Sequence, residues 1–301
     1  MLSFNRLMRF RDHNGNIHYG EAPRTALTGQ YLVGLSIKPY LGNPLECDGL
    51  LSFSEEETTV AEVLSPLSET PIIYGIGLNY RRHAEEAGHP IPSFPVVFTK
   101  PPGGRFHMHN STAWSNGFVD ALAGPFEDIP IGKEAKFIDY EGELCIVIGK
   151  DVKDLLPSAN PFDYILGYTI GNDVSSRYWQ IPERSGNQHG YAKSFDKFAP
   201  IGPVLCSTKV IPDPSALFLT TKVNGEIRQE AKLDDLIFDI PAIIKHLSRG
   251  TTLRKGTIIM TGTPSGVAAG MKPPQWLEDG DTVEVEISNI GMIKNKMKFV
   301  T

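Results

Sequence analysis

The sequence contains little cysteine and no long apolar segment. Only three cysteines occur in the 301 residues, so they cannot all pair, and Cys145 and Cys206 lie in apolar stretches typical of strands. We therefore expect buried free thiols and a reducing compartment, with Cys47 as the third thiol. No apolar run approaches the roughly 18 residues that a membrane-spanning helix needs. The chain also begins without the apolar core of a secretory signal, so we expect no membrane partner.

Basic residues are not in excess. The chain has 29 Lys and Arg against 35 Asp and Glu, which gives a net charge of −6. A protein without an overall positive field is not expected to bind nucleic acid. A local basic group formed by Arg81, Arg82, Arg177 and Lys193 can still attract a small anionic substrate.

The start of the chain allows two interpretations. Arg6, Arg9 and Arg11 precede the first acidic residue, Asp12, which faintly resembles a transit peptide. The same arginines alternate with apolar residues and lead into an Asn-Gly turn at 14–15, which predicts a first strand. We favour the strand and a cytoplasmic location, and keep a mitochondrial location as the alternative.

A compositional boundary lies near residue 70. Before it, short strand-like segments alternate with turns and end in an acidic stretch at 54–57 and a proline-containing linker at 66–71. We predict a small N-terminal domain at residues 1–68 and a larger domain at residues 69–301. At 41% hydrophobic residues, the chain can bury a large core.

Two segments of the larger part have a clear period. Residues 239–250 begin with Asp before Pro and end with Gly, which predicts a helix. Residues 279–291 alternate polar and apolar side chains, as a half-buried strand does. Glu284 and Glu286 are expected on the solvent face of that strand.

An acidic pair in residues 139–149 has the strongest chemical meaning. Glu141 and Glu143 are two apart at the start of an apolar run that reads as a strand, so their side chains share one face. Two close carboxylates repel each other unless a cation lies between them, and a hard divalent cation is the simplest solution. Gly142 between them indicates a close backbone approach. The alternative is an ordinary solvated acidic face.

A third oxygen ligand is expected from Asp173, which directly follows a second strand-like run at residues 164–172. The alternative role for Asp173 is that of a turn residue or helix cap. Three carboxylates with open positions suit Mg²⁺, and Mn²⁺ or Ca²⁺ would fit nearly as well. His and Cys residues do not occur at a spacing that favours zinc.

His83 and Glu86 are candidates for proton transfer. They stand three apart in a short segment of helix formers closed by Gly88, so both should lie on one helical face. A carboxylate beside an imidazole orients it and raises its basicity, as a general base requires. The helix is short and is followed by a loop, which is typical of a lid. A solvated surface helix is the alternative.

Three further segments carry polar candidates. Lys193 follows the polar stretch 185–190, and Arg177 offers a planar fork for a carboxylate. Residues 256–267 read as a buried strand running into a Gly-rich turn, where Thr263 and Ser265 add hydroxyl groups. This turn lacks the Gly-Lys-Ser/Thr of a nucleotide-binding loop, so we expect substrate contacts there.

Seven motifs follow one another along the chain: Ile76-Gly77-Leu78-Asn79-Tyr80 with His83 and Glu86, Phe98-Thr99-Lys100-Pro101, Asp139-Tyr140-Glu141-Gly142-Glu143-Leu144, residues 167–180, Lys193-Ser194-Phe195-Asp196, Val223-Asn224-Gly225-Glu226 and residues 261–267. In this order they resemble the fumarylacetoacetate hydrolase family over about residues 69–301. Residues 103–124 are longer than the family pattern and carry His107, His109 and Trp114, which suggests either a pocket cover or a surface excursion or dimer contact.

The resemblance implies a mainly β, α+β catalytic domain with a rolled mixed β-sheet, usually as a homodimer, beside a small N-terminal domain. It implies Mg²⁺ or Mn²⁺ bound by two glutamates and an aspartate, a catalytic His-Glu pair on a lid helix with a lysine, and side chains that bind substrate oxygens. The matching positions are Glu141, Glu143 and Asp173 for the metal, His83, Glu86 and Lys193 for catalysis, and Arg177, Gln180 and Thr263, with Ser265 added from the Gly-rich turn, for the substrate.

The expected function is hydrolysis of a carbon–carbon bond in a 1,3-dicarbonyl or acylpyruvate-type oxo acid. In that reaction His83 with Glu86 would deprotonate a water, and Lys193 would stabilise the oxyanion. The same metal site would serve an oxaloacetate-type decarboxylase or a keto–enol tautomerase, in which the pair only moves a proton. A metal-binding or ligand-binding protein without catalysis is the least favoured alternative.

Overall fold

The computed structural model describes residues 4–24, 31–43, 46, 52–88, 90–102 and 121–300. Strands dominate these residues, and the α-helices among them are short: α1 (Arg81–Ala87), α2 (Pro182–Ser185) and α3 (Ile240–Leu247). The mainly β, mixed-sheet fold predicted from the sequence is therefore confirmed. Short 3₁₀ turns lie at Pro161–Tyr164, Arg177–Gln180, Tyr191–Lys193, Pro214–Ala216, Leu233–Asp235 and Ala268–Gly270.

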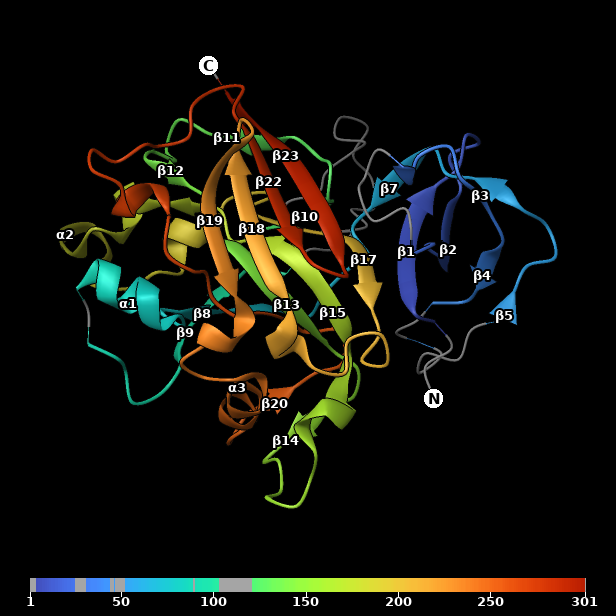
Figure 1. The fold of residues 1–301 in the computed structure, drawn as a ribbon, viewed down its shortest axis with the longest axis horizontal. Helices are drawn as coiled ribbons and strands as arrows, with labels where there is room; N and C mark the ends of the chain where they lie inside the picture. Colours follow the sequence, from blue (N-terminus) through green and yellow to red (C-terminus); the bar gives the residue numbers. More distant parts are fainter. Residues whose placement is uncertain are drawn as a thin grey trace, which may run out of the picture.

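A large mixed sheet forms the centre of the molecule (Figure 1). Its central strands β13 and β15 are buried along their whole length, because apolar residues cover both faces. β8 runs parallel to β21, and the other neighbours on the main path are antiparallel. Along that path the order is β5 (Ser52–Phe53), β4 (Pro39–Leu41), β2 (Ile17–Glu21), β1 (Arg6–Arg11), β17 (Ala199–Cys206), β15 (Ile165–Asn172), β13 (Gly142–Ile148), β21 (Ile258–Met260), β8 (Ile73–Gly77) and β9 (Val96–Lys100), with β10 (Leu122–Ala123) on β17 and β7 (Glu62–Leu64) on β1.

A second sheet packs against β13 and β15, and Figure 1 shows β18 and β22 in front of them. Gly142 permits this approach, because a Cβ added there would lie 2.2 Å from the Thr221 hydroxyl. The second sheet comprises β11 (Ile129–Ile131), β23 (Gly291–Phe299), β22 (Thr282–Ile287), β18 (Phe218–Val223) and β19 (Glu226–Lys232). Short pairs are β12 (Ile138–Asp139) with β16 (Ser175–Ser176), β14 (Val152–Lys153) with β20 (Thr252–Leu253), and β3 (Ser36–Ile37) with β6 (Thr58–Thr59).

The periodic segments fold as their patterns predict. In β22, Val283, Val285 and Ile287 are buried while Glu284 and Glu286 face outward, so the predicted solvent face is confirmed. The Asp239 side chain caps α3 by accepting a hydrogen bond from the Ala242 N–H at 2.8 Å.

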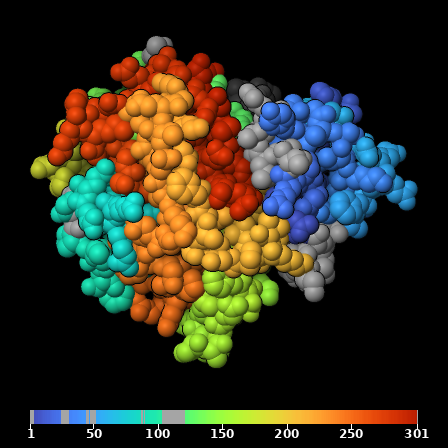
Figure 2. All heavy atoms as spheres, viewed as in Figure 1, coloured from blue at the N-terminus to red at the C-terminus, as the bar shows by residue number. Residues whose placement is uncertain are grey.

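The N-terminal strands continue the large sheet. β1 and β2 form a hairpin around Gly15, as predicted, and β1 also pairs with β17. Figure 2 shows the N-terminal strands as a smaller lobe beside the main body. Phe4 and Leu7 pack in one apolar cluster with Met260 and other residues of the main body. The division of the chain at residue 68 remains a prediction.

Both cysteines of the described residues, Cys145 and Cys206, are buried and free, as expected. Burial raises the pKa of the Cys145 thiol well above its usual value. No helix in these parts of the chain is long and apolar enough to cross a bilayer. Cys47 and the inserted residues 103–120, with His107, His109 and Trp114, lie outside the described residues.

Candidate active site

The three predicted metal ligands meet at one buried point. Glu141, Glu143 and Asp173 each offer a carboxylate oxygen, and these oxygens all lie within 4.8 Å of one another. Glu141 precedes β13, Glu143 is in β13, and Asp173 follows the neighbouring strand β15. The strand period places the two glutamates together, and the antiparallel pairing of β13 with β15 brings Asp173 beside them.

Backbone hydrogen bonds fix the relative positions of these ligands. The Asp173 N–H donates to the Glu141 carbonyl at 2.8 Å, and the Glu141 N–H donates to Oδ1 of Asn172 at 2.9 Å. The Gly262 N–H donates to Oε2 of Glu143 at 2.6 Å, which ties β13 to the turn after β21. The ligands are thus fixed at the paired ends of β13 and β15 and by the turn after β21.

Arg177 and Lys193 form ion pairs with Glu141, whereas no ion pair to Glu143 occurs within the described residues. Arg177 Nη2 lies 2.8 Å and Lys193 Nζ 2.9 Å from Oε1 of Glu141. Burial alone would raise the pKa of Glu141, but these two charges hold it at about 2. Burial and the charges of Asp173 and Glu141 raise the pKa of Glu143 well above its usual value. The cluster therefore carries an acidic group whose charge the protein alone does not balance.

This arrangement fits a hard divalent cation. Three buried carboxylates supply oxygen ligands, and the raised pKa of Glu143 shows that an additional positive charge would be stabilised there. Glu141, Glu143 and Asp173 would hold the ion. The donor set suits Mg²⁺ or Mn²⁺ and offers no sulfur or imidazole ligand.

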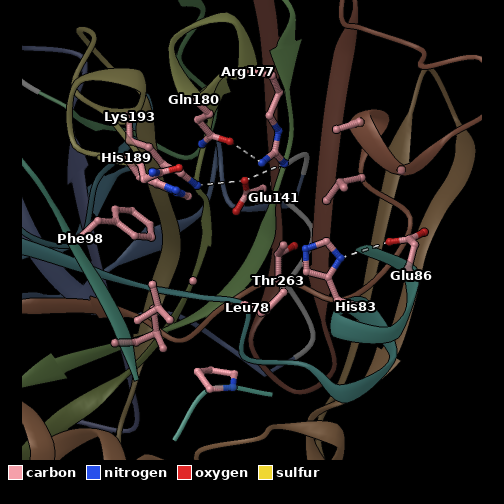
Figure 3. Close-up of a pocket in the computed structure, with 18 of the residues that line it drawn as sticks. Leu78, His83, Glu86, Phe98, Glu141, Arg177, Gln180, His189, Lys193 and Thr263 are labelled. Atoms are coloured by element: carbon pink, nitrogen blue, oxygen red, sulfur yellow. Dashed lines mark hydrogen bonds and ion pairs between the residues drawn. The ribbon is translucent and has the colours of Figure 1, made fainter. Parts of the chain in front are cut away.

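A cavity of about 810 Å³ reaches this cluster at Glu141, which lines it (Figure 3). His83 and Glu86 come into it from α1, at the side away from Arg177 and Gln180. His83 Nδ1 lies 3.1 Å from Oε2 of Glu86, as the predicted helical spacing requires. Glu86 also receives a hydrogen bond from the Gly266 N–H at 3.3 Å, which anchors the pair to the opposite loop.

Residues 72–298 match the family model of the fumarylacetoacetate (FAA) hydrolase C-terminal domain. The chain belongs to the fumarylacetoacetate hydrolase family. The chain is 36% identical to a mitochondrial oxaloacetate tautomerase of Xenopus laevis over 233 residues, which is 77% of this chain and 67% of that protein. The family resemblance inferred from the ordered motifs is thereby confirmed.

Solved structures of the family superpose over nearly the whole chain. A 5-carboxymethyl-2-hydroxymuconate delta-isomerase of Mycobacterium smegmatis is 32% identical with a TM-score of 0.76, covering 98% of this chain and 100% of that one. A 2-hydroxyhepta-2,4-diene-1,7-dioate isomerase of Mycobacterium marinum is 31% identical with a TM-score of 0.75, covering 98% of each chain.

The predicted substrate-binding groups of this family member are engaged with one another. Arg177 donates from Nη1 to Oε1 of Gln180 at 2.9 Å, and its Nε contacts Asp139 at 2.8 Å. The planar fork expected to take a carboxylate is thus bound to protein acceptors in this structure. Lys193, predicted to stabilise an oxyanion, forms ion pairs with Glu141 and Asp173. Burial alone would lower the pKa of Lys193, but these carboxylates raise it.

The two predicted hydroxyl groups differ in position. Thr263 lines the cavity, donates to the Gly142 carbonyl at 3.0 Å and accepts from Gln229 Nε2 at 2.8 Å. Ser265 is half-buried and is not among the described residues that line the cavity. A substrate contact for Ser265 remains a prediction.

Four important residues had no assigned role at the level of sequence. Asp139 contacts Arg177 and accepts the Ala268 N–H at 2.7 Å, so it joins the arginine to the Gly-rich segment. His189 lines the cavity, and burial and the Lys193 charge lower its pKa. The polar stretch 185–190 was a signal for His189, and Asp139 and Lys100 lie in matched motifs that gave them no role. No local pattern pointed to Gln229.

Lys100 is a buried cation in direct contact with the carboxylate cluster. Its side chain is fully buried, and Nζ lies 2.6 Å from Oδ1 of Asp173. The same ammonium donates to the carbonyls of Val174 at 3.1 Å, Lys193 at 2.9 Å and Phe198 at 2.8 Å. Lys100 therefore links β9 to the loop that carries Lys193.

Replacing Lys100 by methionine is expected to destabilise the protein by about 3–5 kcal/mol, because one partner of a buried ion pair is lost while Asp173 stays buried. Urea unfolding of the metal-free protein measures this effect. Lys150→Met is the matched control, because Lys150 is exposed and should change stability by no more than about 0.5 kcal/mol. Equal effects of the two substitutions would contradict the structural role of Lys100.

Proposed function

We propose that this protein is a divalent-metal-dependent keto–enol tautomerase of small 2-oxo acids. The observation that carries this proposal is the His83–Glu86 pair, which lines the same cavity as Glu141 of the buried carboxylate triad. Proton transfer between carbon and oxygen needs a positioned base and a stabilised enolate, but no nucleophile. The site offers both of these requirements.

His83 is the proton carrier in this proposal. With Nδ1 hydrogen-bonded to Glu86, the Nε2 lone pair is left to take a proton from the carbon next to the substrate carbonyl. As that C–H bond breaks, a C=C bond forms and the carbonyl oxygen gains negative charge, and the proton then returns to that oxygen. A bound divalent cation would supply Lewis-acid stabilisation of the negative charge.

Lys193 and Arg177 hold the anionic substrate in this proposal. Both cations line the cavity and contact Glu141, so a carboxylate or enolate oxygen that replaces part of these contacts is held by two charged donors within a buried site. Hydrogen bonds from charged donors in such a site are stronger than in water. Gln180, which contacts Arg177, can orient the guanidinium toward the substrate.

Tautomerisation is favoured over the hydrolysis expected at first from the sequence. The Xenopus relative is named as a tautomerase, and the two solved mycobacterial structures are named as isomerases. Such enzymes move a proton and do not add water across a carbon–carbon bond. These names support the alternative reading of the same residues. A homodimer and a cytoplasmic location remain predictions, and the Xenopus relative is named as mitochondrial.

The proposal is tested by following the ultraviolet absorbance of enol-oxaloacetate as it converts to the keto form. We expect catalysis with Mg²⁺ or Mn²⁺, none after chelation, and recovery on adding the metal back. Oxaloacetate decarboxylation and acylpyruvate hydrolysis should be measured on the same samples. Carbon–carbon cleavage with no effect on the tautomer ratio would reject the tautomerase in favour of the hydrolase or decarboxylase.

A further inference from the structure

A second cavity lies where the N-terminal strands join the main body. Its volume is about 620 Å³, and none of the described residues that line it also lines the cavity at Glu141. Arg6 of β1 lines it at the point where this strand pairs with Cys206 of β17, and Figure 1 shows these two strands side by side. Asn289, in the turn between β22 and β23, lines it from the main body. The cavity is therefore separate from the candidate active site.

Arg6 is a buried cation without a protein partner. The residue is only 8% exposed, and its Nε atom is buried without a hydrogen-bond acceptor. Its guanidinium forms no ion pair with any residue that the structure describes, although a buried charge is normally paired because its desolvation is costly. Two buried lysines follow that rule, since Lys100 and Lys193 both contact Asp173. Arg6 can therefore hold an anion that these parts of the chain do not supply.

The carboxylate beside Arg6 is bound to other groups. Oε1 of Glu21 accepts the Arg6 main-chain N–H at 2.8 Å, and Oε2 accepts the Tyr40 hydroxyl at 2.7 Å and the Asn5 N–H at 3.0 Å. Glu21 thus holds the start of β1 through the main chain and does not pair with the Arg6 side chain. Among the described residues, it is the one acid that lines this cavity.

A second arginine lines the cavity from the segment after β2. Arg24 is exposed, and its side chain forms no ion pair within the described part of the chain. The lining thus carries two unpaired guanidinium groups against one carboxylate that already accepts several hydrogen bonds. The side-chain amides of Asn5 and Asn289 add uncharged donors. This combination of groups favours an anion over a cation or a neutral ligand.

We propose that this cavity binds a small oxyanion with two negative charges, either inorganic phosphate or the phosphate group of a phosphate monoester. Two guanidinium groups match that charge, and their planar forks suit phosphate oxygens. The anion would connect the segment after β2 to β1 and to the main body, so its binding stabilises the folded protein by mass action. The site is independent of the proposed tautomerase reaction, because it uses none of the residues that line the cavity at Glu141.

Calorimetric titration of the metal-free protein with inorganic phosphate, at constant ionic strength, tests the site without a competing metal at the carboxylate triad. We expect one phosphate per chain and a Tm that rises with phosphate but not with added sodium chloride. Acetate, which carries one charge, should bind at least about tenfold more weakly. Glycerol phosphate distinguishes the two sources: binding like that of phosphate assigns the site to a monoester, and no binding assigns it to the free ion.

Substitutions of the two arginines locate the binding. Arg6→Met and Arg24→Met should each weaken phosphate binding by about tenfold or more, because each removes charged hydrogen-bond donors. Arg24 is exposed, so Arg24→Met should leave the fold intact even if Arg6→Met does not. Arg254→Met is the matched control, because Arg254 is also exposed and does not line this cavity. The control should bind phosphate as the unsubstituted protein does.

The results separate this site from the proposed enzyme activity, because no turnover is measured. Stoichiometric binding that the control retains and the arginine variants lose supports the site, whatever the enol-oxaloacetate assay shows. The site is overturned if the unsubstituted protein shows no saturable binding, or if a folded Arg6→Met protein keeps full affinity. If Arg6→Met does not fold, Arg24→Met decides in the same way. Equal affinity for acetate and phosphate overturns the assignment to a doubly charged anion.

Discussion

Replacing Glu143 by glutamine is expected to abolish tight Mn²⁺ binding and at the same time to stabilise the metal-free protein. The metal-free protein buries the Glu143 carboxyl beside Asp173 and Glu141, which raises its pKa and makes its charged form costly at neutral pH. Glutamine removes that charge and can still accept the Gly262 N–H. We expect a gain on the order of 1 kcal/mol in the free energy of unfolding without metal.

The loss of function should be large. Removing a ligand should weaken Mn²⁺ binding by at least about 100-fold, which is the upper range for supporting groups around a metal. Turnover should fall by about 10³-fold, because metal stabilisation of developing charge is worth several kcal/mol. Calorimetric titration with Mn²⁺ and the enol-oxaloacetate assay measure these two effects.

Glu141→Gln is the matched comparison, and its stability effect has the opposite sign. Lys193 and Arg177 hold the pKa of Glu141 at about 2, so its charge stabilises the fold at neutral pH. Glutamine at this position would leave two buried cations with less compensation and should lower the stability of the metal-free protein. Urea unfolding at neutral pH that shows the same sign for both variants would contradict the charge balance inferred for the triad.

Replacing His83 by glutamine should lower kcat by about 10²–10⁴-fold, the usual contribution of a positioned base. KM and Mn²⁺ affinity should change little, because His83 contacts Glu86 rather than the carboxylates of the triad. Steady-state kinetics of enol-oxaloacetate conversion, together with Mn²⁺ titration, make this measurement. A loss of metal binding that parallels the loss of kcat would assign His83 a structural role.

Two controls accompany His83→Gln. Glu86→Gln should cause a smaller loss of kcat, because the imidazole remains and loses only its orienting carboxylate. His13→Gln changes an exposed residue in the turn between β1 and β2 and should have no effect on kcat. If the His13 and His83 variants lost activity equally, the assigned base would be wrong.

Local periodicity determined two parts of the site directly from the sequence. The strand period put Glu141 and Glu143 on one face, and the helical period put His83 next to Glu86. Both relations depend on residues that are close in the chain, so the backbone geometry of one element settles them. The helix after Asp239 and the solvent face of β22 were predictable for the same reason.

Such patterns could not predict contacts between segments that are far apart in the chain. Asp173 joins the glutamates through the pairing of β15 with β13, and beforehand only the ordered set of seven motifs shared with the family could suggest it. Lys100 illustrates the limit more clearly: nothing next to it in the chain indicates that Asp173 is 2.6 Å away. The alternative of a solvated acidic face for Glu141 and Glu143 was decided only by their burial.

The sequence by itself thus determined the chemical groups of this protein, its family, its mainly β fold and the neighbours within each element. Only the tertiary structure decided that Arg177 is held by Asp139 and Glu141, that Lys193 contacts Asp173, and which side chains share the cavity. It also decided that the Phe98 ring, which lines the cavity, fills the space beside Gly75 that a side chain would need. The physical reason is that a period reports the direction of a side chain within its own element, whereas charge balance and cavity shape arise from packing between elements.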